Sequence, residues 1–334
     1  MTAAEHRQVH VREASQPSEA RMIARDVAET AGLNETDTYR ASIVASELAT
    51  NLVKYAESGE LLLRAIDDGM TKGVEILSID RGPGLGDLDQ AMRDGHSTGG
   101  SPGTGLGAVR RLSEEFDLHS TPRGTIVFSR VYAGRRPAPT APFVVGAVSV
   151  ALAREEPCGD SWAVRVNQRT VDALVVDGLG HGFFAAEAAQ AAVGAWLPDR
   201  YPAIADALSA IHDGIRHTRG AAGAIVEIDT ESRIVRFAGV GNVAAAILMA
   251  DGKARQTVSH NGTLGREVRQ FREFAYPWDS GLLVVHSDGL TSHWSLDAYP
   301  GLNRRHPAVI AGVLYRDFSR GRDDVTVLVC REAA

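Results

Sequence analysis

The chain has few cysteines, no long hydrophobic run and no large excess of one charge. Its 334 residues include only two cysteines, Cys158 and Cys330, which are too far apart to indicate a disulfide framework or a paired-cysteine metal site. Both are expected to be ordinary thiols. The longest apolar-leaning stretch, residues 141–153, is interrupted by glycine and falls short of the ~20 residues that a membrane helix needs.

Charge and the N-terminal segment exclude further classes of function. The formal net charge is −7, whereas a general nucleic-acid-binding surface needs a basic face that neutralises phosphates. The first residues, MTAAEHRQVHVREA, are too charged for a secretory signal. We therefore expect a cytoplasmic protein that has neither a nucleic-acid nor a membrane partner.

A proline-rich segment predicts the domain boundary. Residues 133–142 read AGRRPAPTAP, and alternating proline can neither join a sheet interior nor continue a helix. The length of the chain suits two domains of ordinary size. We expect a first domain over residues 1–133, a semi-rigid linker over 134–142 and a second domain over 143–334.

The first half is predicted to be an α/β domain with helices on one face of a mixed sheet. Apolar residues at helical spacing indicate a first helix with Ser18 as its N-cap and a second helix over about residues 37–56. Three strands and a further helix complete the half: residues 60–66, 73–80 and 124–131, and a helix from about Gly105.

The second half contains many short strands rich in valine or isoleucine, bounded by turn residues. Two helices are expected among them, over about residues 184–197 and 204–217. The predicted strands are residues 143–153, 162–167, 172–177, 221–229, 234–240, 244–250, 281–288 and 324–330. This pattern predicts a β-sandwich with helical layers outside.

Four aspartates lie at the ends of these predicted strands: Asp160, Asp177, Asp288 and Asp323. Alternate strand ends of an antiparallel sandwich meet at one edge, and like charges that share an edge raise one another's pKa values. A divalent cation removes that conflict, and hard oxygen ligands suit Mg²⁺ or Mn²⁺ rather than zinc. A single Asp-Gly pair is an ordinary turn signal, so this prediction depends on the whole set.

Together these segments resemble the metal-dependent protein phosphatase (PPM) family in its SpoIIE-like bacterial branch. The matching segments are GD at residues 159–160, VDGLGHG at 176–182, SDG at 287–289 and DDVTVLV at 323–329. The resemblance covers roughly residues 143–331. It implies a PPM-type fold and a serine/threonine phosphoprotein phosphatase that uses two Mn²⁺ or Mg²⁺ ions.

The same resemblance implies roles for individual residues. Asp177 would bridge both ions, and Gly178 would offer its carbonyl oxygen. Asp288 and Asp323 would hold one ion, and Asp160 would complete the cluster. Asp177, Asp288 and Asp323 are thereby predicted to be catalytic as well as metal-binding.

Catalysis in this family needs no side-chain nucleophile. Two metal ions lower the pKa of a bridging water and neutralise the phosphate, so that hydroxide attacks phosphorus in line. Eukaryotic members place a histidine directly after the Asp-Gly pair, where this chain has Leu179, and His181 lies two residues further along. The general acid stays open between His181 and a metal-bound water. Asp324 falls where many relatives carry asparagine and is treated as secondary.

A second polar pattern occurs in the first half of the chain. Glu47, Asn51 and Lys54 are spaced i, i+4 and i+7, so they share one narrow face of the predicted second helix. A solvated helix face is the ordinary alternative. The segments that follow favour the wall of a nucleotide-binding pocket.

Two glycine-rich segments come after this helix. In SIDRGPGLGD, Asp80 ends an apolar strand and is followed by Gly82, Gly84 and Gly86. The segment STGGSPGTGLGAVRRL contains five glycines, and an amphipathic helix follows. A glycine-rich loop that enters a helix N-terminus binds anions, because backbone N–H groups and the helix dipole both face the ligand.

In this order, the segments resemble the GHKL (Bergerat-fold) ATP-binding family, in its branch of anti-sigma-factor and stress-module switch serine kinases, over about residues 20–131. The resemblance implies that Asp80 reads the adenine amino group, Asn51 binds Mg²⁺ and Thr125 lines the adenine pocket. Glu47 occupies the place of the catalytic base. The segment expected to wrap the phosphates consists of Gly103, Thr104, Gly105, Leu106 and Gly107.

The two resemblances predict an ATP-binding, switch-kinase-like domain fused to a phosphoserine/phosphothreonine phosphatase. By analogy with such families, the expected substrate is a phosphorylated STAS-type antagonist or scaffold protein. Two alternatives stay open: a non-catalytic partner-switching module, and a net serine kinase whose product the second domain reverses. A homodimer is also left open.

Overall fold

The computed structural model describes residues 5–56, 58–67, 71–86, 105–134, 142–152, 157–249 and 253–333. The chain forms two compact units, which do not follow the sequence order strictly. The N-terminal unit comprises His6–Ala138 together with Leu296–Arg316. The C-terminal unit comprises Met1–Glu5, Pro139–Ser295 and Asp317–Ala334. No helix in the described ranges is long and apolar enough to cross a membrane.

The N-terminal unit contains a five-stranded sheet with the order β1-β2-β3-β5-β4. Its strands are β1 (Arg7–Val11), β2 (Gly59–Asp67), β3 (Lys72–Asp80), β4 (Glu115–Thr121) and β5 (Gly124–Tyr132). Its first helices are α1 (Gln16–Thr30), α2 (Glu35–Tyr55) and α4 (Gly105–Leu112). All neighbouring strands in this sheet are antiparallel, so the expected mixed sheet is wrong in that detail.

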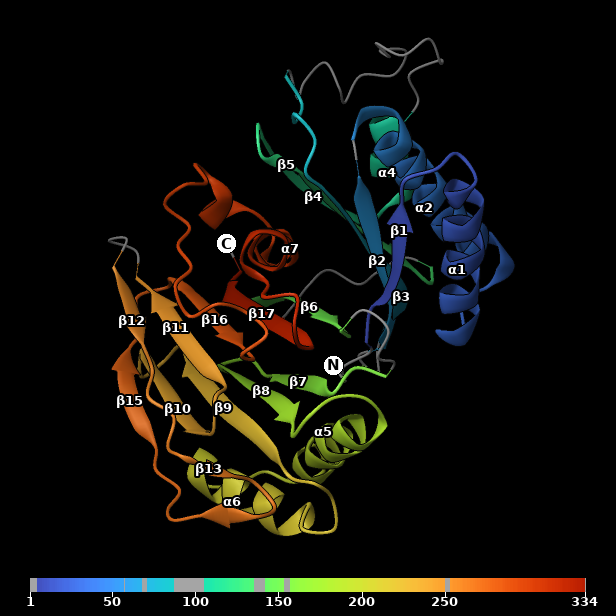
Figure 1. Ribbon diagram of the computed structural model, residues 1–334. Helices are drawn as coiled ribbons and strands as arrows, with labels where there is room; N and C mark the ends of the chain where they lie inside the picture. The colour runs from blue at the N-terminus through green and yellow to red at the C-terminus, as the bar shows by residue number, and fades with distance from the viewer. Residues whose placement is uncertain are drawn as a thin grey trace. The chain divides into compact units, whose positions relative to one another are not determined.

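One face of this sheet packs against α1 and α2 (Figure 1). Leu61, Ile76 and Val127 point to this face, where they form one buried core with residues such as Ala24 and Leu48. Successive strand residues point to opposite faces, so Leu62, Leu77 and Phe128 lie on the other side. A large apolar sheet surface therefore needs a second cover.

Part of that cover comes from a distant segment of the sequence. The 3-10 helix η1 (Leu302–Arg304) and α7 (Pro307–Phe318) lie in the second half of the chain, but residues 296–316 join the N-terminal unit. The His306 ring stacks on Phe128, with ring centroids 3.9 Å apart. The sequence predicted neither helix. The expected second domain, residues 143–334, includes this segment, whereas the structure groups it with the N-terminal unit.

The C-terminal unit is a two-sheet sandwich. One sheet has the order β15-β10-β9-β8-β7 and the other β12-β11-β16-β17-β6, with a small β13-β14 pair beside them. The strands are β6 (Phe143–Val150), β7 (Asp160–Val166), β8 (Thr170–Gly178), β9 (Ala221–Asp229), β10 (Ile234–Val240), β11 (Ala244–Leu248), β12 (Ala254–Gln256), β13 (Gly262–Thr263), β14 (Glu267–Val268), β15 (Phe274–Pro277), β16 (Leu282–His286) and β17 (Val325–Glu332).

Two buried layers hold this sandwich together. Trp162, Phe237 and Leu328 belong to the core between the two sheets. Outward-pointing residues such as Leu174 and Ile225 form a second core with α5 (Phe183–Trp196) and α6 (Ile204–Gly214), which cover the outer face of one sheet (Figure 1). The expected α/β class, with helices outside an antiparallel sandwich, is confirmed.

One predicted helix start is wrong. The first helix begins at Gln16, with Ser15 and not Ser18 as its N-cap. Ser15 makes no side-chain capping bond, whereas the Gln16 side chain accepts hydrogen bonds from the backbone N–H groups of Arg12 and Glu13. Pro17 lies in the first turn, where its missing N–H costs little. Gln16 and Pro17 therefore set a start one turn earlier than the apolar spacing indicated.

Candidate functional site

Two of the predicted metal ligands face each other on neighbouring strands. Asp160 begins β7 and pairs in register with Asp177, the penultimate residue of β8. Gly178 follows, and its N–H donates to the carbonyl oxygen of Gly159 across a distance of 3.0 Å. A Cβ at Gly178 would lie 2.1 Å from the Ala185 carbonyl oxygen, so α5 can begin against this strand end only because residue 178 is glycine.

The other two ligands come from the second sheet. Asp288 follows β16 and Asp323 precedes β17, and these strands are neighbours in that sheet. Burial, then the charges of Asp288 and Asp323, raise the pKa of Asp177 to about 7. Burial and the charge of Asp177 hold the pKa of Asp160 well above its usual range. Asp177 therefore interacts electrostatically with Asp160, Asp288 and Asp323, and the sharing of a cation by these groups stays a prediction.

Two polar residues that the sequence did not single out hold these carboxylates in place. The Ser287 hydroxyl donates to Asp160 Oδ2 at 2.6 Å and accepts a hydrogen bond from the Thr326 backbone N–H at 3.0 Å. The Asn242 amide donates to Asp288 Oδ2 at 2.7 Å. Ser287 lies inside the SDG motif, but Asn242 lies in the turn between β10 and β11, far from any carboxylate in the sequence.

Asp324 has a different environment from the other aspartates. Its carboxylate accepts hydrogen bonds from the backbone N–H groups of Leu152, at 2.6 Å, and Gly159, at 2.7 Å. Burial raises the pKa of this carboxyl group. The side chain fixes the backbone next to Asp160, and its secondary role at the metal site stays a prediction.

An exposed apolar surface borders the carboxylates. Leu179, Phe183 and Phe184 lie two, six and seven residues after Asp177 and are 55%, 67% and 55% exposed. The Arg219 guanidinium lies 5.0 Å from the centre of the Phe184 ring, and the Leu179 N–H donates to the Gly220 carbonyl oxygen. We call Leu179, Phe183, Phe184 and Arg219 the aromatic ledge. His181 is exposed within the same loop.

The donor set suits hydrated hard cations. Among the described residues, no three His, Cys, Asp or Glu side chains lie close enough to ligate one ion directly. Mg²⁺ usually keeps several water molecules and binds through one or two carboxylates, so it needs no such cluster. Cys158 and Cys330 are both buried and form no disulfide bond.

The N-terminal unit places Asp80 at the end of β3. Its Oδ1 atom accepts hydrogen bonds from the backbone N–H groups of Gly82, at 2.7 Å, and Thr125, at 3.0 Å. Burial raises the pKa of this carboxyl group. The Thr125 hydroxyl is hydrogen-bonded to Ser120 at 2.9 Å, and Ser120 also accepts from the Leu85 N–H. These bonds bring the loop after β3 against β4 and β5.

The glycines after Asp80 differ in their surroundings. Gly84 has a φ of +78°, and a Cβ there would lie 2.3 Å from the Thr121 carbonyl oxygen, so no other residue fits. A Cβ at Gly82 would lie 3.0 Å from the Tyr55 carbonyl oxygen at the end of α2. Gly86 has open space around it. Gly82 and Gly84 thus determine the conformation of the loop, while a part of Gly86 in nucleotide binding stays a prediction.

The predicted Mg²⁺ ligand meets the start of α4. A Cβ at Gly105 would lie 3.0 Å from Asn51 Oδ1, so the two residues are in direct contact only because position 105 is glycine. Glu47 is half-buried one turn earlier on α2, and Lys54 is exposed near its end. Leu106 packs against the core, and Gly107 is buried within α4. The predicted phosphate-binding residues Gly103 and Thr104 lie outside the described residues.

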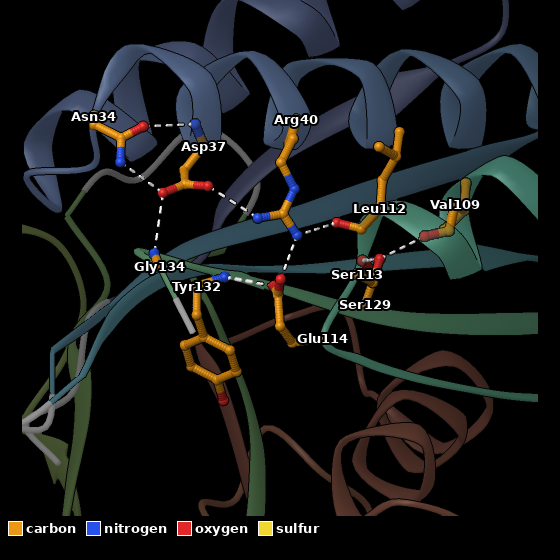
Figure 2. A network of polar contacts seen from close by, with 10 residues as sticks. All are labelled: Asn34, Asp37, Arg40, Val109, Leu112, Ser113, Glu114, Ser129, Tyr132 and Gly134. Atoms are coloured by element: carbon orange, nitrogen blue, oxygen red, sulfur yellow. Dashed lines mark hydrogen bonds and ion pairs between the residues drawn. The ribbon is translucent and has the colours of Figure 1, made fainter. Parts of the chain in front are cut away.

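A polar network fixes the other end of α4 (Figure 2). Arg40 on α2 donates to the Leu112 carbonyl oxygen at 2.8 Å and pairs with both Asp37 and Glu114. Asp37 also accepts from the Gly134 N–H at 3.0 Å. The network ties α2, the C-terminus of α4 and the end of β5 together, so the N-terminus of α4 is held beside Asn51.

Known protein families match both halves of the chain. Residues 11–130 match the family described as "Histidine kinase-like ATPase domain". Residues 167–332 match the family described as "Stage II sporulation protein E (SpoIIE)". The second match includes residues 296–316, which join the N-terminal unit.

Two curated relatives from Bacillus subtilis (strain 168) correspond to the two halves. The serine/threonine-protein kinase RsbT is 41% identical over 101 residues, which cover 30% of this chain and 76% of RsbT. The phosphoserine phosphatase RsbX is 25% identical over 136 residues, which cover 40% of this chain and 67% of RsbX.

Solved structures share the architecture. One, described as "The bacterial stressosome: a modular system that has been adapted to control secondary messenger signaling", is 28% identical, with a TM-score of 0.52, and covers 57% of this chain and 99% of its own. RsbX in complex with magnesium is 18% identical, with a TM-score of 0.50, and covers 60% of this chain and 99% of its own. At this identity, the second likeness shows the fold alone.

Proposed function

Since the chain belongs to the histidine kinase-like ATPases through its first half and to the SpoIIE-type PPM phosphatases through its second, we propose that it dephosphorylates serine or threonine in a STAS-type partner-switching protein. In this proposal, Mn²⁺ or Mg²⁺ serves the phosphatase half, and ATP with Mg²⁺ binds the first half as a regulator. The relatives RsbT and RsbX, a kinase and a phosphatase, support this combination.

The observation that carries the phosphatase proposal is the effect that carboxylates next to one sheet have on Asp177 in the other sheet. Asp177 has a pKa of about 7, raised by burial and by the charges of Asp288 and Asp323. Folding brings these acids together against their repulsion, which a bound cation relieves. Asp177, Asp160, Asp288 and Asp323, with the carbonyl oxygen of Gly178, would hold the ions.

Bound divalent ions would supply an activated water and neutralise the phosphate charge. The residues of the chain orient this chemistry. Ser287 holds Asp160 and Asn242 holds Asp288, each through a hydrogen bond to the Oδ2 atom of the carboxylate. His181, exposed in the loop that follows Asp177, is one candidate to protonate the leaving oxygen.

The aromatic ledge would receive the polypeptide on either side of the phosphorylated residue. It is continuous with the loop that follows Asp177, and its apolar side chains are exposed. Arg219, held against Phe184, supplies a positive charge suited to a phosphate. The segment that best fits the ledge is therefore a phosphoserine or phosphothreonine flanked by apolar residues.

One observation favours a second function, protein serine kinase activity. Glu47 is half-buried on α2, one turn before Asn51, in the place of the catalytic base of related kinases. The RsbT relative is itself described as a serine/threonine-protein kinase. In this alternative, the first half phosphorylates the partner protein, and the second half reverses that reaction.

The test is release of phosphate from a phosphoserine peptide with Mn²⁺ and without ATP. We expect turnover by the wild type and none by Asp177→Asn, because that variant loses a charge shared by both ions. Calorimetry should show unchanged ATP binding by the variant, which serves as its folding control. Near-normal turnover by Asp177→Asn would exclude this site assignment, and phosphate transfer only from ATP to protein would favour the kinase alternative.

The natural substrate can be identified with the same variant. A metal-site variant that still binds its phosphoprotein but does not turn it over retains the complex in a pull-down. We expect the captured protein to be phosphorylated on serine or threonine and to have a STAS fold. Mass spectrometry of the captured protein checks both points.

A further inference from the structure

The segment 296–316 belongs to the phosphatase half by sequence and to the ATPase half by structure. It lies between Asp288 and Asp323, the two predicted metal ligands of the second sheet, and inside the SpoIIE match. Its contacts nevertheless make it part of the N-terminal unit. A single stretch of chain thus connects the predicted metal ligands to the fold of the other half.

This segment is attached at several points along the sheet. Its His306 N–H donates to Asp117 on β4 at 2.6 Å, and Arg305 pairs with the same carboxylate at 3.2 Å. Tyr315 on α7 is hydrogen-bonded to Gln8 on β1, at 3.2 Å, and to Glu60 on β2, at 3.3 Å. These contacts reach both edges of the sheet, so the segment has one defined position on it.

The backbone of α7 also comes close to the middle of the sheet. A Cβ at Gly312 would lie 3.1 Å from the Ile126 side chain, which is tighter than ordinary packing. A residue with a side chain would push α7 away from β5. Gly312 therefore determines how closely α7 packs against β5, the strand that carries Thr125.

The last residue of the segment reaches the predicted adenine-binding residue. Arg316 is 5% exposed, and its guanidinium Nη1 donates to the Asp80 carbonyl oxygen at 3.1 Å. The Arg316 carbonyl oxygen accepts a hydrogen bond from the Arg81 side chain. Two successive residues at the end of β3 are therefore bonded to Arg316.

Gly124 makes this approach feasible. Its φ is +124°, and a Cβ there would lie 2.0 Å from the Asp80 carbonyl oxygen and 2.8 Å from Arg316 Nη1. The next residue, Thr125, donates its N–H to the Asp80 carboxylate. Arg316 and Thr125 thus hold Asp80 from its backbone and from its side chain, which fixes the direction in which the carboxylate points.

We propose that Arg316 is a positioning residue of the nucleotide site, supplied by the phosphatase half, and that it orients Asp80 toward the 6-amino group of an adenine nucleotide. The positive charge of Arg316 also favours the ionised form of Asp80, the form that accepts hydrogen bonds, against the effect of burial. The inference rests on the proposed adenine-reading role of Asp80.

The position of Arg316 gives nucleotide binding a route to the phosphatase. Arg316 lies seven residues before Asp323 (323 minus 316). A nucleotide that orders Asp80 favours the docked state of 296–316, because Arg316 is bonded to Asp80 in that state. Coupling of this kind needs a difference in free energy between docked and undocked states of the segment.

The test measures ATP and inosine triphosphate (ITP) binding to the full chain by calorimetry, with Mg²⁺. ITP lacks the 6-amino group that Asp80 would read. We expect the wild type to prefer ATP, and Arg316→Ala to lose about 5-fold or more of that preference. Arg316→Lys should keep most of it, because an ammonium group can donate to the same carbonyl oxygen. Arg304→Ala, which changes an exposed arginine in the same segment, should behave as the wild type.

Simple destabilisation is distinguished from positioning by the ratio of the two affinities. A destabilised protein would bind both nucleotides more weakly and keep its preference for ATP, and that result would overturn the proposal. If Arg316→Ala does not fold, Arg316→Gln retains a hydrogen-bond donor without the charge and takes its place. Asp80→Ala distinguishes failure of the Arg316 proposal from failure of the proposed role of Asp80. An unchanged preference for ATP over ITP in that variant means that Asp80 does not read the adenine.

Discussion

Asn242 donates a hydrogen bond from its side-chain amide to Asp288, with nitrogen and oxygen 2.7 Å apart. β11 follows Asn242 and pairs in antiparallel register with β16, which precedes Asp288. The two residues therefore lie at the same end of this strand pair. Asn242 is thus placed to fix the orientation of a predicted metal ligand. Partners of this kind tune the affinity of a metal site without touching the ion.

We expect Asn242→Ala to weaken Mn²⁺ activation of phosphate-ester hydrolysis by about 10-fold or more, the usual effect of removing such a partner. The Asp288 carboxylate would lose its fixed orientation and bind the ion less well. The concentration of Mn²⁺ at half-maximal turnover of p-nitrophenyl phosphate measures this effect. Asn261→Ala, an exposed asparagine of the same unit, is the control, and equal activation curves for both variants would contradict the prediction.

Metal removal should make the stability of the protein depend on pH near neutrality. The pKa of Asp177 is about 7 in the folded protein, against an ordinary value of 3.8. Between these values the folded state binds more protons than the unfolded state, so the free energy of unfolding falls as pH rises. The stabilising contribution of the bound proton is present at low pH and is lost as pH rises through about 7.

Urea unfolding of the chelated protein from pH 5.5 to 8 checks this expectation. We expect the midpoint to decrease as pH rises, and Mn²⁺ to restore more stability at pH 8 than at pH 5.5. Asp177→Asn cannot ionise at this position, so its midpoint should change less over the same range. A midpoint that rises with pH in the chelated wild type would show that the carboxylates do not repel one another.

Loss of either predicted nucleotide contact should affect one half of the chain only. Asp80→Ala removes the acceptor for the adenine amino group, and Asn51→Ala removes the oxygen that meets the start of α4. We expect each variant to lose MgATP affinity by about 10-fold or more, since a lost hydrogen bond to a charged group costs about 1.5–3 kcal/mol. Calorimetry measures this loss.

The matched measurement for these variants is Mn²⁺-dependent hydrolysis of p-nitrophenyl phosphate. Neither Asp80 nor Asn51 belongs to the C-terminal unit, so the rate should stay within about 2-fold of wild type. Unchanged ATP binding in Asp80→Ala would count against the adenine role, and a large loss of ester hydrolysis would show that the residue supports the whole fold.

The aromatic ledge predicts substrate selectivity. We expect the double variant Phe183→Ala, Phe184→Ala to lower kcat/KM for a phosphoserine peptide with apolar flanks by about 10-fold, equivalent to about 1.4 kcal/mol of lost contact. Hydrolysis of p-nitrophenyl phosphate should not change, because that ester is too small to reach the ledge. Val258→Ala, at a valine that is 58% exposed elsewhere in the unit, is the control.

A peptide with acidic flanks separates this prediction from a general defect. The wild type should prefer the apolar peptide, and the double variant should treat both peptides alike. An equal loss on both peptides and on the small ester would mean that Phe183 and Phe184 support the start of α5 instead of binding substrate.

The long apolar strands, and the aspartates at their ends, could be predicted because local patterns specify them. An apolar run that is followed by Asp-Gly, as at Asp177 and Asp288, indicates a strand and a carboxylate at its end. Asn242 could not be found in this way, since its contact with Asp288 joins positions 46 residues apart. Hydrogen bonds between distant turns follow from the fold and leave no spacing signal in the sequence.

α7 was missed for a physical reason. Every residue from Pro307 to Arg316 is buried, so the helix has no polar face and no apolar stripe of helical period. β4 was missed because EFDLHST mixes polar and apolar residues at a sheet edge. The packing of residues 296–316 onto the N-terminal unit could not be anticipated, because their position in the sequence predicted that they belong to the C-terminal domain.

Nucleotide should control turnover of the true phosphoprotein substrate. The chain between Asp288 and Asp323 contains the segment that docks beside Asp80, and the proline-rich linker keeps the two halves on one short tether. A ligand that favours the docked segment can therefore bias the metal site. We expect MgATP to change phosphoprotein turnover by about 5-fold or more, the lower end of typical coupling between sites.

Turnover of the captured phosphoprotein, with and without a non-hydrolysable ATP analogue, measures this coupling. The wild type should respond, whereas Asp80→Ala should not, because it no longer binds the analogue. Arg316→Ala should respond less than the wild type even at saturating analogue, since its segment is no longer bonded to Asp80. Hydrolysis of p-nitrophenyl phosphate should change much less, because it needs no docked protein. Identical phosphoprotein rates in all of these conditions would mean that the two halves act independently, joined by the chain alone.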